Sequence, residues 1–286
     1  MNKRNLCVGL VLITLVLSVW ILPGCIRVEA ANKGSTQVVD SEKEFVQAIY
    51  DNLLMGNKTF SMVYEGDWED IYQNDIDGLF RKVCAIDDKR TSDDFDYMKE
   101  NLRKYTLSYI WNDKHCEFDF KIEYWESKAQ TKKVNSVVKS ELKKMKLSKA
   151  SNYTKVKRIH DFIVNRTTYD TSYQRYTAYE ALVNKKSVCQ GYAMLFYKMA
   201  TEAGVPCRLV TSSDHAWNIV KIGKKWYHVD TTWDDPISSK PILRYDYFMK
   251  GSDTMAGDHV LSPEFCTKAF KKKYPISRAD YRKKSK

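Results

Sequence analysis

The sequence lacks the close ligand pairs that anchor most protein-bound metal ions. Its 286 residues contain no Cys-x-x-Cys pair and no His-x-x-x-His pair, and no acidic loop has the ligand spacing of a calcium site. A zinc site built from Cys189, His215, His228 and Asp230 is the non-nucleophilic alternative, but it has no such pair to anchor the ion. We therefore expect neither a metal nor a cofactor.

The basic runs of the chain also lack interleaved aromatic residues. The net charge is +11, and the excess concentrates in the lysine-rich segment 131–149 and in the tail 268–286. Proteins that bind single-stranded nucleic acid combine such charges with stacking rings, so nucleic acid is not an expected partner. On an exported protein the charge suits anionic cell-envelope polymers, lipid headgroups or acidic proteins. A solvated basic surface without a specific partner is the alternative.

The N-terminus has the plan of an export signal. A short basic stretch, Met1–Asn5, precedes an unbroken apolar run from Leu6 to Leu22. We assign residues 1–30 to a signal peptide or lipoprotein signal, and expect a secreted protein or a cell-surface lipoprotein. The tetrapeptide ending at Cys25 resembles a lipobox in which that cysteine is lipidated, whereas cleavage after Ala30 fits equally well. An uncleaved anchor is the third alternative. Membrane contact is expected only through this segment.

The remainder of the chain divides by pattern into four parts. Residues 31–40 are small and polar and suit a tether. Residues 41–127 mix amphipathic helix patterns with strand-like runs, which predicts a small α+β domain that either positions substrate or only extends the core. Residues 128–150 predict a basic connecting helix. Residues 151–286 form the predicted second domain, which holds the reactive residues.

Cys189 stands at the start of a predicted helix. Apolar side chains recur after it at three- and four-residue spacing, and the pattern stops at Gly204-Val205-Pro206, a helix-ending signal. Backbone N–H groups at a helix start are unpaired and carry partial positive charge, which favours a thiolate over a thiol. Cys189 is therefore the candidate nucleophile.

Two strand-like segments follow, at residues 216–221 and 225–231. They are rich in Val, Ile, Trp and Tyr, with Gly223-Lys224 as a hairpin turn. Antiparallel pairing would bring His215 near Asp230. A carboxylate there would select the imidazole tautomer and stabilise the imidazolium that forms when the histidine takes the thiol proton.

These motifs resemble the catalytic core of the transglutaminase-like superfamily, whose members share a papain-like arrangement of a helix-borne cysteine and strand-borne histidine and aspartate. The three blocks are Ser187–Ala193, Asp214–Asn218 and Trp226–Pro236. The resemblance implies an α+β fold in which the nucleophile helix packs on an antiparallel sheet. It also implies that Cys189 is the nucleophile, His215 the general base and acid, and Asp230 the residue that orients His215.

Four further residues are candidate substrate contacts. Gln190 would polarise a carbonyl, although backbone N–H groups at the helix start are the favoured oxyanion hole. Tyr169 either lines the site or packs in the core, and the same two interpretations hold for Trp217 and Trp233. Two other histidines, His160 and His228, are interpreted as packed or hydrogen-bonded side chains. A disulfide between Cys84 and Cys116 is compatible with export but is not established by spacing.

We expect an exported cysteine enzyme that forms a thioester acyl-enzyme with a peptide or carboxamide carbonyl. Water as the acceptor makes it a peptidase or amidase, a hydrolase; an amine makes it a crosslinking transamidase, an acyltransferase. Hydrolysis of peptides in proteins or in the cell wall is favoured slightly. An inactive cell-envelope binding module is the alternative from another class.

Overall fold

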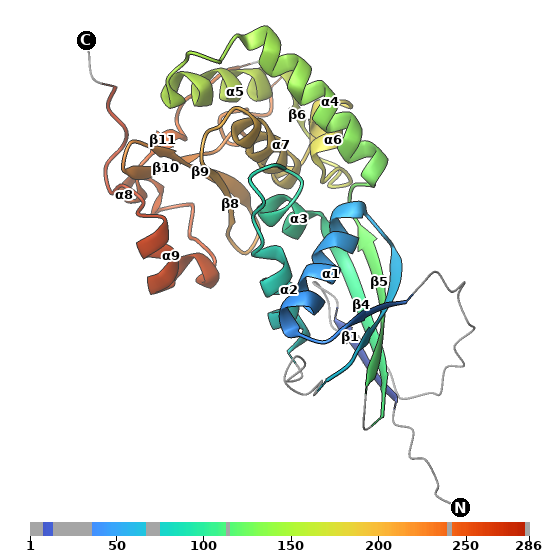
Figure 1. Cartoon of the computed structure of the whole chain (residues 1–286). Coiled ribbons are helices and arrows are strands. Elements are labelled where there is room, and N and C mark those ends of the chain that lie inside the picture. The colour runs from blue at the N-terminus through green and yellow to red at the C-terminus, as the bar shows by residue number, and fades with distance from the viewer. Residues whose placement is uncertain (1–7, 14–35, 67–74, 113–114, 239–241, 284–286) are drawn as a thin grey trace, which may run out of the picture. The chain divides into compact units, whose positions relative to one another are not determined.

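The computed structural model describes residues 8–13, 36–66, 75–112, 115–238 and 242–283 (Figure 1). These residues form two compact units: Met1–Asp87 with Leu102–Tyr124, and Asp88–Asn101 with Trp125–Lys286. Residues 88–101 and 125–150 thus group with the second unit. The sequence pattern instead placed all of residues 41–127 in the N-terminal domain and residues 128–150 in a separate connector.

The first unit contains a five-stranded sheet of order β1-β4-β5-β3-β2. The strands are β1 (Val8–Ile13), β2 (Gln37–Val39), β3 (Thr59–Tyr64), β4 (Leu102–Trp111) and β5 (Cys116–Tyr124), and the helices are α1 (Glu42–Met55) and α2 (Ile76–Cys84). Alternate residues of β5 are buried, as expected for a sheet with one face in the core. In this structure Cys116 is a buried free thiol, so no disulfide joins it to Cys84.

Part of the apolar run predicted as an export signal forms strand β1. It pairs antiparallel with β4, with Val8 opposite Ile110 and Ile13 opposite Tyr105. Cys25 and Ala30 lie outside the described residues, so both ways of processing the signal stay predictions. No helix in the described ranges is long and apolar enough to span a bilayer.

The second unit is built around a four-stranded antiparallel sheet of order β11-β10-β9-β8. Its strands are β8 (Cys207–Thr211), β9 (Ala216–Ile222), β10 (Lys225–Val229) and β11 (Phe248–Lys250), and two short parallel strands, β6 (Thr168–Tyr169) and β7 (Lys186–Ser187), pair separately. The helices are α3 (Phe95–Asn101), α4 (Lys128–Met145), α5 (Asn152–Arg166), α6 (Ala178–Leu182), α7 (Cys189–Glu202), α8 (Ser252–Met255), the 3-10 helix η2 (Pro263–Cys266) and α9 (Lys268–Lys273).

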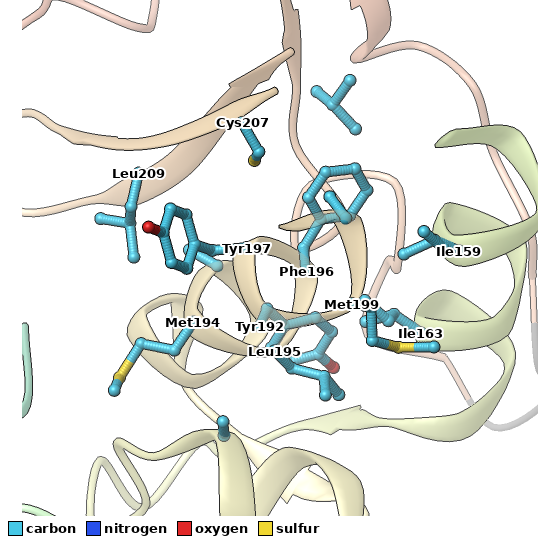
Figure 2. Packing of buried hydrophobic residues seen from close by; sticks show 14 of the residues in the cluster. Ile159, Ile163, Tyr192, Met194, Leu195, Phe196, Tyr197, Met199, Cys207 and Leu209 are labelled. Atoms are coloured by element: carbon cyan, nitrogen blue, oxygen red, sulfur yellow. The ribbon is translucent and has the colours of Figure 1, made fainter. Parts of the chain in front are cut away.

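Helix α7 lies at the centre of this unit, between α5 and the sheet strands β8 and β9 (Figure 1). The spacing of its apolar residues suggests an amphipathic helix. In the structure, however, every residue from Gly191 to Ala200 is buried, so the helix is covered on all sides. Figure 2 shows its side chains directed both toward Ile159 and Ile163 of α5 and toward Cys207 and Leu209 of β8. Burying each large apolar side chain contributes about 1.5–3 kcal/mol to the free energy of unfolding. Because α7 is packed in this way along its length, its first residue, Cys189, lies on a rigid element.

Candidate active site

Cys189 is the first residue of α7 and is half-buried. Among the described residues no side chain caps the helix at Val188, so the positive end of the helix is left to the cysteine sulfur. Gly191 in the first turn touches Ser187 and the Thr177 carbonyl so closely that a Cβ atom has no room. The local packing therefore sets where the sulfur lies.

His215 and Asp230 flank one end of the β9–β10 hairpin. His215 immediately precedes β9, Asp230 immediately follows β10, and the hairpin pairs Val229 with Asn218. His215 Nε2 lies 2.6 Å from Asp230 Oδ2. The Cys189 side chain interacts electrostatically with the same imidazole and helps to raise the pKa of His215. Because Nε2 faces Asp230, Nδ1 is the ring nitrogen left for the sulfur, and the three predicted residues come together in the predicted order.

The electrostatics of this site favour a charged pair. Burial works to raise the pKa of Asp230, but hydrogen bonds from His215 and His259 outweigh it and hold that pKa below its usual range. Burial works to lower the pKa of His215, but the hydrogen bond with Asp230 and the interaction with Cys189 raise it to about 10. At neutral pH His215 is therefore an imidazolium beside the cysteine sulfur.

His259 is a site residue that the sequence interpretation missed. Its Nε2 lies 2.8 Å from the same Asp230 Oδ2 that His215 contacts, and its Nδ1 lies 2.7 Å from Asp258 Oδ1. It sits in the loop between α8 and η2, outside any strand or helix pattern. Around His259 the local sequence offered only the adjacent Asp258 as a signal, and an Asp-His pair by itself does not indicate an active-site residue.

The three side chains His215, Asp230 and His259 offer ligand atoms within 4.8 Å of one another, and among the described residues this is where a metal ion would fit. The oxygens of Asp230, however, are already fully engaged. Oδ2 accepts from both imidazoles, and Oδ1 accepts from the backbone N–H groups of Thr232 and Trp233 at 2.8 and 3.2 Å. These four bonds take up the acceptor capacity of a carboxylate. The arrangement is that of an oriented, ionised aspartate.

His228, named in the zinc alternative, has a different environment. Its Nδ1 accepts a hydrogen bond from Trp217 Nε1 at 2.9 Å. Burial and then the charge of His259 lower the pKa of His228 to about 4. It is thus a neutral acceptor that fixes the Trp217 indole.

The aromatic candidates take two kinds of position. Trp217 is buried and stacks on His215 with 5.7 Å between ring centroids, so it packs beneath the imidazole. Trp233 is 41% exposed and also lies 5.7 Å from the His215 ring, at a tilt. Burial and then the charge of Cys189 raise the pKa of Tyr169 to about 12. Half-buried Tyr169 and exposed Trp233 are therefore the aromatic residues available beside the reactive pair.

Gln190 is held by the backbone. Its Nε2 donates to the carbonyl oxygen of Glu100 at 2.8 Å. With the amide engaged there, the backbone N–H groups at the start of α7 are the donors left for a developing oxyanion, and Gln190 instead ties α7 to the end of α3.

The two aspartates after Asp230 have their own partners. Asp234 Oδ2 lies 2.9 Å from Nε2 of buried His160, and Asp235 accepts from the Tyr192 hydroxyl at 2.6 Å. Burial raises the pKa of Asp235 to about 6. These contacts tie the segment to α5 and α7, which explains the run of acidic residues and leaves Asp230 alone for His215.

Comparison with known proteins identifies the core. Residues 141–231 match the model of the transglutaminase-like superfamily, and this segment contains Cys189, His215 and Asp230. The match confirms the predicted resemblance, and the α+β fold with a transglutaminase-like core is confirmed with it.

More distant relatives cover only part of the chain. The kyphoscoliosis peptidases of Homo sapiens and Mus musculus are 32% and 29% identical over 108 and 137 residues, which are 30% and 38% of this chain. The chain spans only 16% and 21% of those proteins. The crystal structure of a TGase aligns with 73% of this chain and 61% of its own, with 15% identity and a TM-score of 0.32.

Proposed function

We propose that the transglutaminase-like core makes this chain a cysteine hydrolase of peptide or carboxamide bonds, with Cys189 as nucleophile. The observation that carries the proposal is the 2.6 Å hydrogen bond between His215 and Asp230, together with the interaction of the same imidazole with Cys189 at the start of α7. A nucleophile, a base and a group that orients the base are the three parts that acyl transfer through cysteine requires.

The reaction follows from the roles of these atoms. The Cys189 thiolate attacks the substrate carbonyl, and backbone N–H groups at the start of α7 stabilise the oxyanion. The His215 imidazolium gives its proton to the departing amine, which leaves a thioester on Cys189. Neutral His215 then takes a proton from the attacking water, and collapse of the second tetrahedral species releases the acid and restores the Cys189 thiolate beside the His215 imidazolium. Asp230 keeps the ring oriented through both halves.

The acceptor decides the name of the activity. Two relatives are named peptidases, which favours water over an amine. A lysine amine in place of water would make the enzyme a crosslinking transamidase. The two activities separate in one assay, because a labelled primary amine is incorporated into a glutamine peptide only by the second.

The cellular setting belongs to the same proposal. The basic start and apolar run within residues 1–30 support an exported protein acting on protein or cell-wall peptides near anionic envelope polymers. Cell fractionation with intact mass of the mature chain tests it. A mass that retains residues 1–30 on a cytoplasmic protein would contradict export.

Labelling of the thiol tests the enzyme proposal. Brief iodoacetamide treatment at mildly acidic pH modifies a thiolate and leaves ordinary thiols almost untouched. Because Cys266 is an exposed thiol, a Cys266→Ala background keeps the mass readout on the active site. Rapid single labelling is expected there, lost in Cys189→Ala and slowed in His215→Ala. No preferential labelling of Cys189 would indicate an inactive binding module.

A further inference from the structure

Two imidazoles share one carboxylate oxygen in this site. We propose that His259 is a positioning residue of the active site. As a buried cation between Asp258 and Asp230, it orients Asp230 and partly offsets the rise in the His215 pKa that the Asp230 carboxylate causes. The inference deepens the proposed function and rests on it.

The hydrogen bonds define the protonation of His259. Its Nδ1 faces Asp258 Oδ1 at 2.7 Å and its Nε2 faces Asp230 Oδ2 at 2.8 Å. An ionised carboxylate only accepts hydrogen bonds, so each ring nitrogen must carry a proton. Burial raises the pKa of both aspartates, but their hydrogen bonds outweigh it and keep both pKa values below the usual range. His259 is therefore an imidazolium.

The ring has no freedom to leave this position. Its side chain is fully buried, and it packs edge-on against Trp217 and Trp233 with centroids 4.9 and 4.7 Å apart. Tyr247 lies 5.0 Å from the ring and donates its hydroxyl to Asp258 Oδ2 at 2.7 Å. The Asp258 carboxylate is thereby held as well, so a hydrogen-bonded series reaches from Asp258 through His259 and Asp230 to His215.

The charges around His259 determine its effect on the reactive pair. The groups that face it are the carboxylates of Asp230 and Asp258, the imidazolium of His215, neutral His228 and the Tyr247 ring. The His215 and His259 rings lie 5.4 Å apart. Two like charges at that distance repel by roughly two pKa units at an effective dielectric constant of about 20. His259 thus opposes the pull of Asp230 and keeps the His215 proton available for a leaving group.

Replacing His259 by glutamine removes this charge while leaving an amide that can still donate to Asp230. Loss of a nearby cation raises the pKa of a thiol and of an imidazolium alike. The acid limb of Cys189 alkylation is therefore expected to move up by about one pH unit. Imidazole NMR can follow the protonation of His215 directly. Near pH 10, where half of the wild-type His215 has lost its proton, His215 in the His259→Gln variant is expected to stay protonated. If His259 had only a structural role, its loss would weaken the interaction between Cys189 and His215. The acid limb of Cys189 alkylation would then move to higher pH, and the His215 titration to lower pH.

His160→Gln is the matched control. His160 is also fully buried between two carboxylates, with Nδ1 3.2 Å from Asp161 and Nε2 2.9 Å from Asp234, but it is not bonded to Asp230. Equal shifts of the Cys189 and His215 titrations in His160→Gln and His259→Gln would overturn the inference. So would unshifted titrations in a His259→Gln variant whose circular dichroism is native. If His259→Gln does not fold, His259→Asn, which also removes the charge, must move both limbs up. Unshifted limbs in a folded His259→Asn would likewise overturn the inference.

The readouts separate this inference from the proposed function. Slow labelling of wild-type Cys189 would refute the proposed function, whereas fast labelling with unchanged His259→Gln limbs refutes only the role of His259. The same experiment is run with zinc and with a chelator. Wild-type labelling that needs zinc would assign His215, Asp230 and His259 to a metal ion and overturn the inference.

Discussion

Replacing Gly191 by alanine is expected to displace Cys189 from its position at the start of α7. A Cβ atom on Gly191 would lie 2.0 Å from Ser187 Oγ and 2.5 Å from the Thr177 carbonyl oxygen, and contacts under 3.0 Å essentially never occur. Ser187 Oγ is held by its hydrogen bond to the Arg175 carbonyl at 2.9 Å. The Thr177 oxygen accepts from the first helical turn of α6. Neither neighbour can move away at little cost.

The magnitude follows from these distances. The Thr177 contact is roughly 1 Å short of ordinary van der Waals separation, so the first turn of α7 must move by a similar amount. Overpacking of this kind costs about 1–3 kcal/mol of unfolding free energy. A reactive group displaced by about 1 Å loses on the order of a hundredfold in rate. The loss of Cys189 reactivity should therefore exceed what the change in stability suggests.

Urea unfolding and the rate of Cys189 alkylation measure the two effects separately. Gly257→Ala is the matched control, because apart from its own chain neighbours no heavy atom of the described residues lies within 4 Å of the added Cβ. Adding Ser187→Ala to Gly191→Ala should restore only part of the rate, since it leaves the Thr177 clash in place. Gly191→Ala with wild-type alkylation and unchanged unfolding free energy would refute the reasoning.

Three further predictions concern charged groups of the second unit. Asp230→Asn removes the carboxylate that supports the His215 imidazolium, so alkylation of Cys189 at pH 5 should fall roughly tenfold or more; an unchanged rate would contradict the role of Asp230. Because the pKa of His215 rises from its ordinary 6.5 to about 10 on folding, its stabilisation is complete below pH 6.5 and is lost as the pH rises through about 10. The unfolding free energy should drop between pH 7 and 10 in the wild type and much less in His215→Ala, as urea titrations at both pH values would show. Lys198 is fully buried in α7 and pairs with Asp93, so Lys198→Met should cost about 3 kcal/mol in the same assay. A variant as stable as the wild type would show that the pair makes no net contribution.

The sequence by itself determined the parts of the site that depend on local pattern. Apolar spacing and the Gly204-Val205-Pro206 signal predicted the helix that Cys189 begins. Two β-rich runs around Gly223-Lys224 predicted the hairpin that brings His215 to Asp230. These features are local because each is specified within one helix or one hairpin, where side-chain periodicity reports the geometry directly.

Only the tertiary structure decided which distant groups complete the site. His259 meets Asp230 across 29 residues, from a loop without periodicity, and Gln190 meets the Glu100 carbonyl across 90. The grouping of residues 88–101 and of α4 with the second unit is equally invisible to pattern. Closing a long loop costs little more entropy than closing a shorter one, so sequence separation hardly constrains where a chain returns. Periodicity reports which face of an element is buried, whereas the partner that buries it is selected by packing of the whole unit.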